Sequence, residues 1–378
     1  INRDSYYGGG QDLNAYGNTT DLNWMAGSQY VYSFAKCIFM PSDLTAGIEF
    51  NQDKLEDNMW GYNRTVDQKV NIGSAFLQNE WKNEHWGFLI GGRLDKHNLI
   101  DHVIFSPRAN LRYNPTENIN LRFSYSSGFR APQAFDEDLH VENVGGNVAM
   151  VELADNLKEE RSQSLSASAD IYHRFGAFQV NFLVEGFYTK LSDVFALTDG
   201  ETVDGILTRT RYNAPGARVM GLTLEGKMAY LTKFQLQAGV TLQQSHYSEP
   251  HVWNPDAPAV KKMMRTPNTY GYFTATYTPI KPLSIALSGT YTGSMLVPHE
   301  PVPGFLENPI TVNTKDFFDI GLKAAYDFKL YKSMNLQVNA GIQNIFNAYQ
   351  NDFDKGADRD SGYIYGPSLP RSFFAGVK

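Results

Sequence analysis

The sequence predicts an all-β fold, a transmembrane antiparallel β-barrel, and three observations lead to this class. Apolar and polar residues alternate with a period of two from one end of the chain to the other. The connections between these segments are alternately short turns and long polar stretches, as in outer-membrane barrels. Aromatic residues make up 13% of the 378 residues and charged residues only 19%, which is unusual for a soluble domain.

The alternation is clearest in the segment from Phe234 to Gln243. Phe, Leu, Ala, Val and Leu occupy one face of this segment, and Gln, Gln, Gly, Thr and Gln occupy the other. A helix would mix the two sets, whereas a strand keeps them apart. A polar face rich in Gln, Asn, Ser and Thr suits a wet barrel interior, although a β-sandwich shares the simple alternation.

Connection lengths favour the barrel over the sandwich. Tight turns occur at residues 114–118, 174–177, 231–233, 279–282 and 329–333, and long polar excursions at 130–161, 248–268, 293–315 and 344–370. The segments between them number about 15, whereas bacterial single-chain barrels have an even number of strands. We therefore expect the complete barrel to have further strands N-terminal to residue 1. We also expect one tall strand over residues 206–230, with a bulge at Asn213–Gly216 because Pro and Gly mark such sites.

Charge and cysteine content exclude several classes of protein. The formal net charge is −7 and there is no run of basic residues, so no nucleic-acid partner is expected. Cys37 is the single cysteine, which excludes an intrachain disulfide. No combination of nucleophile, base and orienting group emerges from the sequence, so the protein is not expected to be an enzyme.

Three stretches resemble the TonB-dependent outer-membrane receptors. SYSSGFRAPQAFDEDLH, residues 124–140, is similar to the family's entry into a long extracellular loop. NIFNAYQ at residues 344–350, with YGPSLPRSFFAGVK at 365–378, is similar to the last loop and closing strand. RYNAPGARVMGLTLEG resembles the family's long kinked strand. The resemblance covers essentially the whole chain.

The resemblance implies a barrel of about 22 strands, plugged by an N-terminal domain, in the bacterial outer membrane. Residues 1–378 would be its C-terminal part, about the last 15 of these strands, with the plug and first strands missing. The implied partners are the TonB–ExbB–ExbD complex, reached through the missing plug, outer-membrane lipids and a large small-molecule ligand. A surface-exposed lipoprotein is a further candidate partner.

The implied function is active import of a large scarce nutrient. A corrinoid such as vitamin B12 is the first expectation, because the chain as a whole resembles corrinoid and haem receptors. Haem or a ferric siderophore is the alternative within the family. From a different class, a passive porin or a structural outer-membrane barrel also remains open. A plug domain encoded upstream would favour the receptor.

Aromatic and polar residues on long loops are the candidates for ligand binding, since loops on a rigid scaffold carry recognition. These candidates are Tyr6, Tyr7, Tyr16, Trp60, Tyr62, Arg64, Phe135 and His140. No cofactor is expected, although clustered loop carboxylates could hold calcium. The calcium candidates are Asp136, Asp138, Asp352 and Asp354, without the spacing of a 12-residue calcium loop. If the ligand is haem, His140, His251 and His299 could supply an axial nitrogen.

Overall fold

The computed structural model describes residues 2–6, 16–135, 148–203, 206–356, 359–360, 362–367 and 369–378. Almost all regular structure within these ranges is β-strand, and one 3-10 turn, η1 (Trp60–Tyr62), is present. In the described part of the chain no helix has the length and apolar character needed to cross a membrane.

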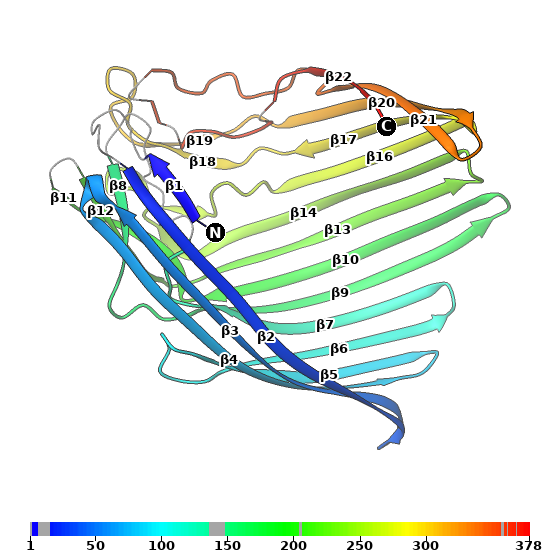
Figure 1. Ribbon diagram of the computed structural model, residues 1–378, viewed down its shortest axis with the longest axis horizontal. Helices are drawn as coiled ribbons and strands as arrows, with labels where there is room; N and C mark the ends of the chain where they lie inside the picture. The colour runs from blue at the N-terminus through cyan, green and yellow to red at the C-terminus, as the bar shows by residue number, and fades with distance from the viewer. Residues whose placement is uncertain are drawn as a thin grey trace.

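One continuous antiparallel sheet forms a curved wall (Figure 1). Its long strands are β2 (Tyr16–Cys37), β3 (Met40–Met59), β4 (Arg64–Lys82), β5 (Trp86–His97), β6 (Ile104–Thr116), β7 (Ile119–Arg130), β9 (Glu160–Phe175), β10 (Phe178–Ser192), β13 (Ala217–Tyr230), β14 (Phe234–His251), β16 (Thr269–Ile280), β17 (Leu283–Thr292), β20 (Phe317–Tyr331), β21 (Met334–Gln343) and β22 (Ser372–Val377). Two short strands, β1 (Asn2–Tyr6) and β15 (Val260–Lys262), pair with β2 and β14. With these two included, the sheet has 17 strands in the described part, so the expected number of long strands is confirmed.

The pairing register keeps the two faces of the wall chemically distinct. Val240 lies opposite Leu224 on one side and Gly271 on the other, whereas the next residue, Thr241, lies opposite Thr223 and Tyr270. Directly paired residues share a face of the sheet. The alternation that predicted the strands therefore becomes one apolar and one polar surface.

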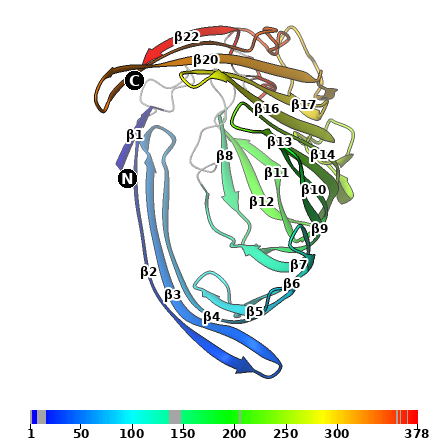
Figure 2. The same cartoon turned by 90° about the vertical axis from the view of Figure 1, so that its right-hand side faces the viewer.

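The polar surface is the concave one. A second sheet of β8 (Val148–Leu153), β12 (Ile206–Ala214) and β11 (Val194–Val203) lies inside the curve of the wall (Figure 2). The Arg64 side chain of β4 donates a hydrogen bond to the Val151 carbonyl of β8. Arg64 and Ser74 are an even number of positions apart on the same strand, so both belong to the polar face. That face lines the lumen, and the convex apolar face meets lipid.

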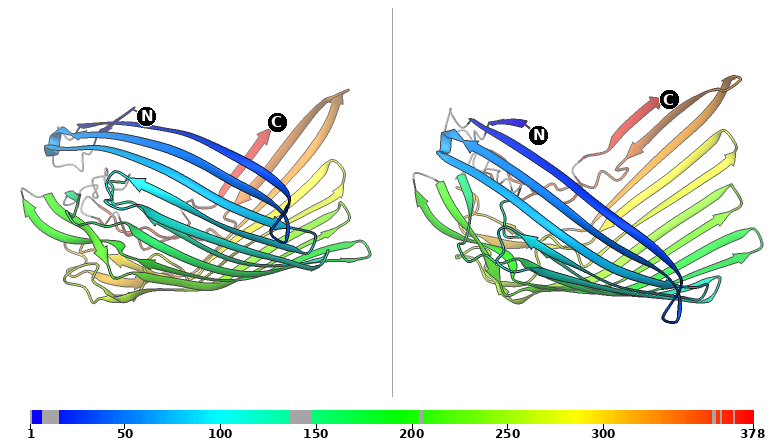
Figure 3. Two further views of the ribbon diagram at one scale, coloured as in Figure 1. Left: turned by 90° about the horizontal axis from the view of Figure 1, so that it is seen from below. Right: turned by 60° about the horizontal axis from the view of Figure 1, so that its bottom comes forward.

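The sheet is open in the described residues (Figure 3). One edge is β22, and the other is β2, whose first residues, Tyr16 to Thr20, also pair with the short β1. Tight turns join the strands at one end of this trough, and the long connections gather at the other end (Figure 1). The molecule is thus a partial barrel, the class of fold that the sequence predicts.

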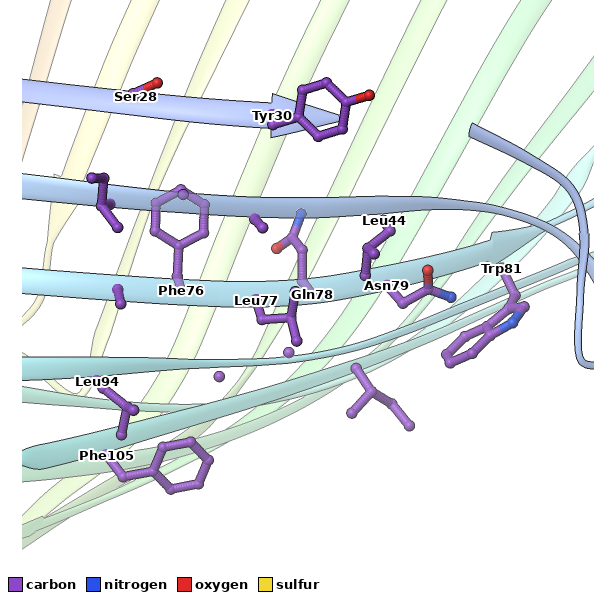
Figure 4. A pocket seen from close by; sticks show the side chains of 17 residues that line it. Ser28, Tyr30, Leu44, Phe76, Leu77, Gln78, Asn79, Trp81, Leu94 and Phe105 are labelled. Carbon is purple, nitrogen blue, oxygen red and sulfur yellow. The ribbon is translucent and has the colours of Figure 1, made fainter. Parts of the chain in front are cut away.

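A shallow hollow of 880 Å³ lies over strands β2 to β6 on the apolar side (Figure 4). Leu44, Leu77, Leu94 and Phe105 are among the side chains that line it. These residues share the lipid-facing register, since Leu77 lies opposite Ala46 and Leu94 lies opposite Phe105. The hollow is therefore part of the membrane-facing surface and does not belong to a substrate path through the lumen.

Strands β3 and β4 are 20 and 19 residues long, whereas the period-two alternation of the sequence marks only residues 44–53 and 69–78 within them. The residues between these segments and the hairpin tip include the charged residues Lys54, Glu56 and Asp57. Above the membrane both faces of a strand meet water or loops, so the alternation that marks a strand in lipid is lost there. Period-two patterning consequently finds only the membrane-level part of these strands.

An arginine at Leu287 tests which face meets lipid. Leu287 lies mid-strand in β17, opposite Ala275 and Leu322, whereas its neighbour Ser288 points to the lumen opposite Thr274 and Gly321. We expect Leu287→Arg in the full-length protein to lower the free energy of unfolding in liposomes by about 2–4 kcal/mol. Ser288→Arg, the matched control, should have a much smaller effect. Equal losses in urea titrations of both variants would contradict the assignment.

Candidate functional site

The mouth of the barrel is partly covered by the small sheet β8–β12–β11. Strands β10 and β13 pair in the wall with Leu191 opposite Ala217, and β11 and β12 continue with Val194 opposite Ala214. The register is therefore the same on both sides of the break. Strands β11 and β12 are the upper half of one long hairpin, and they leave the wall for a second sheet.

The expectation of one tall strand with a bulge over residues 206–230 is wrong. No extra residue enters the hairpin at Asn213–Gly216, where the bulge was expected; instead both strands break at the same level. Asp193 has φ 54° and Gly216 has φ 117°, backbone conformations that an extended strand does not contain. A Cβ on Gly216 would lie 2.5 Å from the Leu191 carbonyl oxygen, so this side of the break requires glycine.

The new direction of the hairpin is held by the Asn213 side chain of β12, which bonds to the backbone of Lys158 in the longest connection. Asn213 donates hydrogen bonds to the carbonyls of Asp193 and Lys158, at 2.8 and 3.0 Å. Its own side-chain oxygen accepts from the Lys158 backbone N–H at 2.7 Å. Strand β8 then pairs with β12 in parallel. The small sheet β8–β12–β11, called the cover below, is therefore held in place by hydrogen bonds.

Phe135 joins this cover to the wall. The Arg130 guanidinium, at the end of β7, lies 3.8 Å from the centre of the Phe135 ring, and that of Arg211 on β12 lies 5.3 Å away. The Phe195 ring of β11 is 6.2 Å from the Phe135 ring, between centres. Aromatic rings attract cations at such distances. The structure thus brings Arg130, Phe195 and Arg211 to the candidate Phe135, and single-residue sequence reasoning identified only Phe135.

The tip of the β3–β4 hairpin contacts β8 of the same cover. Tyr62 packs against a buried cluster that contains Met59 and Met150 of β8. Trp60 is 56% exposed, and Arg64 donates to the Val151 carbonyl at 2.7 Å. Of these three sequence-predicted residues, Trp60 has the most exposed aromatic ring, while Tyr62 and Arg64 contact the small sheet.

The calcium candidates Asp352 and Asp354 have protein partners in the last long connection. The Tyr365 and Tyr363 hydroxyls donate to Asp352, at 2.7 and 3.2 Å. Burial acts to raise the pKa of Asp352, but these hydroxyl groups hold that pKa below its ordinary value. Asp354 lies 2.9 Å from Nε2 of His299. Among the described residues, no group of three or more His, Cys, Asp or Glu could hold a metal ion.

Two of the three loop histidines have contacts within the protein. His299 stacks on Tyr363, with ring centres 3.8 Å apart, and its Nε2 faces Asp354. The rings of His251 and Tyr247 are in contact at an angle of 37°, with ring centres 4.8 Å apart.

Tyr6 and Tyr16 pair with each other through β1 and β2, and only their backbone is described. Tyr7, Asp136, Asp138 and His140 lie outside the described residues.

The lumen wall below the mouth carries a polar network that sequence reasoning did not identify. Arg93 of β5 donates to Glu49, Ser74 and Asp95 on the lumen faces of three strands, at 2.8, 2.8 and 2.7 Å. Ser74 also donates to Asp95 at 2.6 Å. Shared acceptors and donors rigidify a buried polar surface. Only the strand register, which places these residues side by side, reveals the network.

Phe135 provides a test of how the cover is held. In the full-length protein we expect Phe135→Ala to increase amide hydrogen exchange in β11 and β12 by about tenfold, because each cation–aromatic contact contributes about 0.5–2 kcal/mol. Exchange in the wall strands β10 and β13 should stay unchanged. Phe305→Ala, which removes a ring that is 77% exposed, is the matched control. If exchange in β11 and β12 were equal in both variants, the contacts of Phe135 with Arg130 and Arg211 would not hold the small sheet in place.

Comparison with known proteins agrees with the barrel wall described above. Residues 1–345 match the family described as "TonB dependent receptor-like, beta-barrel". No curated protein matches the sequence.

Several solved structures have a similar fold. The FrpB iron transporter of Neisseria meningitidis (F5-1 variant) is similar with a TM-score of 0.70 and 16% identity, over 100% of this chain and 59% of that one. The siderophore receptor PirA of Acinetobacter baumannii has a TM-score of 0.67 and 16% identity, over 96% and 55%. The ferric enterobactin receptor PfeA of Pseudomonas aeruginosa (Q482A mutant, with enterobactin) has 0.67 and 17%, over 96% and 54%.

The chain thus spans a little over half the length of these structures, and at such low identity they support the fold alone. The family match, however, covers most of the sequence and agrees with a wall that is polar inside and apolar outside. This chain belongs to the TonB-dependent receptor family, as part of its β-barrel.

Proposed function

We propose that the full-length protein is an outer-membrane receptor that actively imports an iron chelate, a ferric siderophore in the first place. The observation that carries this proposal is the family match over residues 1–345. TonB-dependent receptors are transporters of the outer membrane. The wall of this chain, with a polar lumen and a covered mouth, is the scaffold such a transporter needs.

The choice of ligand rests on the similar structures. FrpB is named an iron transporter, PirA a siderophore receptor and PfeA a ferric enterobactin receptor. They favour the siderophore alternative over the corrinoid that overall resemblance ranked first. Haem and corrinoids are the alternative ligands against which the siderophore is tested.

The mouth has groups that suit a large ligand with aromatic rings and polar edges. Trp60 offers an exposed ring at the tip of β3–β4, and Arg64 lies at the start of the next strand. An aromatic side chain supplies a large contact surface for stacking. We propose this tip as one ligand contact, with the long connections around it supplying others.

Energy and partners complete the proposal. An N-terminal plug would contact TonB, and the TonB–ExbB–ExbD complex would supply the energy for release into the periplasm. A surface lipoprotein over the mouth and calcium in the extracellular loops remain candidate additions. A passive porin or a structural barrel is the competing function, and it predicts no dependence on the proton gradient.

Ligand binding to the full-length receptor tests the substrate. Purified receptor in detergent should show saturable binding of a ferric catecholate or hydroxamate siderophore by fluorescence quenching, and little binding of haemin or cyanocobalamin. Trp60→Ala should weaken the binding about tenfold, since stacking contributes on the order of 1 kcal/mol. Trp86→Ala, at the tight-turn end, is the control. Saturable binding of haemin or cyanocobalamin alone would overturn the iron-siderophore assignment.

Uptake in cells tests active transport separately. In a strain without its own siderophore receptors, the full-length protein should support accumulation of radioactive iron from the bound siderophore. A protonophore or deletion of TonB should abolish this accumulation. Accumulation that persists under both treatments would instead identify a passive pore.

A further inference from the structure

Four basic side chains form one cross-strand row on the convex face. Lys190 of β10 lies directly opposite Arg218 of β13, Arg218 opposite His246 of β14, and His246 opposite Lys262 of β15. Paired residues share a face, and Lys190 lies two positions beyond Tyr188 on the lipid-facing register. We call these four residues the basic row.

Direct opposition of like charges on a sheet is destabilising unless an anion lies between them. Within the described part of the chain, Lys190, Arg218 and Lys262 form no salt bridge. On the neighbouring strand β9, Gln163 lies opposite Lys190. Arg161, two residues from Gln163, differs from the basic row because its guanidinium lies 2.6 Å from the Glu159 carboxylate. The basic row therefore presents concentrated positive charge to the outside of the barrel.

The basic row lies at the upper boundary of the apolar band. On β10 the outward positions Phe178, Val180, Phe182, Val184 and Tyr188 are apolar or aromatic, and Gly186 lies among them. From Phe178 to Tyr188 the strand rises about 33 Å at roughly 3.3 Å per residue. With a tilt of about 40° this corresponds to roughly 25 Å, the height of an outer-membrane apolar band. Lys190 is the next outward position toward the long-loop end.

Directly below the basic row lies a second hollow, of 810 Å³. Its floor is formed by Ala167 and Gly186, which lie opposite each other. A Cβ on Gly186 would have nothing within 4 Å, so the floor is open toward lipid. Taller apolar side chains border it: Phe123, Leu165, Tyr188, Met220, Leu222 and Leu242.

The geometry points to a binding site for one phosphorylated lipid of the outer leaflet. An acyl chain would lie in the hollow over Gly186, and its phosphate-bearing headgroup would lie against the basic row. Lysine and arginine bind phosphate through charge-assisted hydrogen bonds. The hollow and the basic row are continuous across four strand positions, from Gly186 to Lys190. An amphiphile at the membrane boundary fits both parts, whereas a soluble anion would use only the row.

Lipid retention by the full-length receptor tests this site. Native mass spectrometry of receptor in detergent, titrated with bisphosphorylated lipid A, should show one lipid bound in preference to dephosphorylated lipid A and phosphatidylethanolamine. The triple variant Lys190→Gln, Arg218→Gln, Lys262→Gln should lower this binding at least tenfold, because each cation near a membrane surface contributes measurably to anionic lipid binding. Lys190 and Arg218 are exposed, so the fold should tolerate the change.

The matched control removes the same charge at the other end of the barrel. Lys36→Gln, Lys233→Gln and Lys281→Gln change three exposed residues near the tight turns, and they should leave lipid A binding unchanged. Equal loss in both triple variants would overturn the site, since it would show a general effect of net charge. Equal binding of phosphorylated and dephosphorylated lipid A by the native receptor would also overturn it.

A second variant tests the hollow without altering the basic row. Gly186→Leu would place a side chain over the floor, where a Cβ meets no neighbour. We expect it to lower lipid A binding severalfold while siderophore binding at the mouth stays unchanged. Undiminished lipid binding by this variant would remove the hollow from the site. Because siderophore binding is measured in parallel, failure of the lipid site would be distinguishable from failure of the proposed function.

Discussion

Backbone hydrogen bonding in lipid is the constraint on which the structure depends. Hydrocarbon offers no partner for an N–H or C=O group, so each strand in the membrane must pair with its neighbours. Pairing then fixes which side chains share a face, and the register of the wall places Val240 with Leu224 and Thr241 with Thr223. The apolar outer surface and the polar lumen follow from that register.

The constraint ends at the membrane boundary, where the chain gains freedom. The hairpin of β10 and β13 keeps its register but breaks at Asp193 and Gly216, and its upper half joins β8 in a separate sheet. The break lies just beyond Lys190, at the level where lipid gives way to water and loops. There, side chains such as Asn213 can pair with backbone groups that a ladder would otherwise satisfy.

Charges on the two faces of the wall have different surroundings. In the lumen, Arg93 is neutralised by Glu49 and Asp95 within one hydrogen-bonded network. On the convex face, Lys190 and Arg218 stand beside each other at the membrane boundary. A lumen-facing charge can be paired by neighbouring strands, whereas an outward-facing charge at this height has lipid headgroups beside it.

The sequence by itself determined the fold class, the number of long strands and the two faces of each strand, because period-two alternation is a local property imposed by lipid on one side. It also identified Trp60 and Phe135 as loop residues of interest, but not the arginines that flank Phe135. Arg130 and Arg211 are far apart in the chain, and only the fold of β12 into the mouth brings them to one ring. The inward turn at Gly216, the Arg93 network and the basic row likewise depend on which strand positions lie opposite each other. Tertiary structure decided them, since cross-strand register is a relation between distant segments that no single segment encodes.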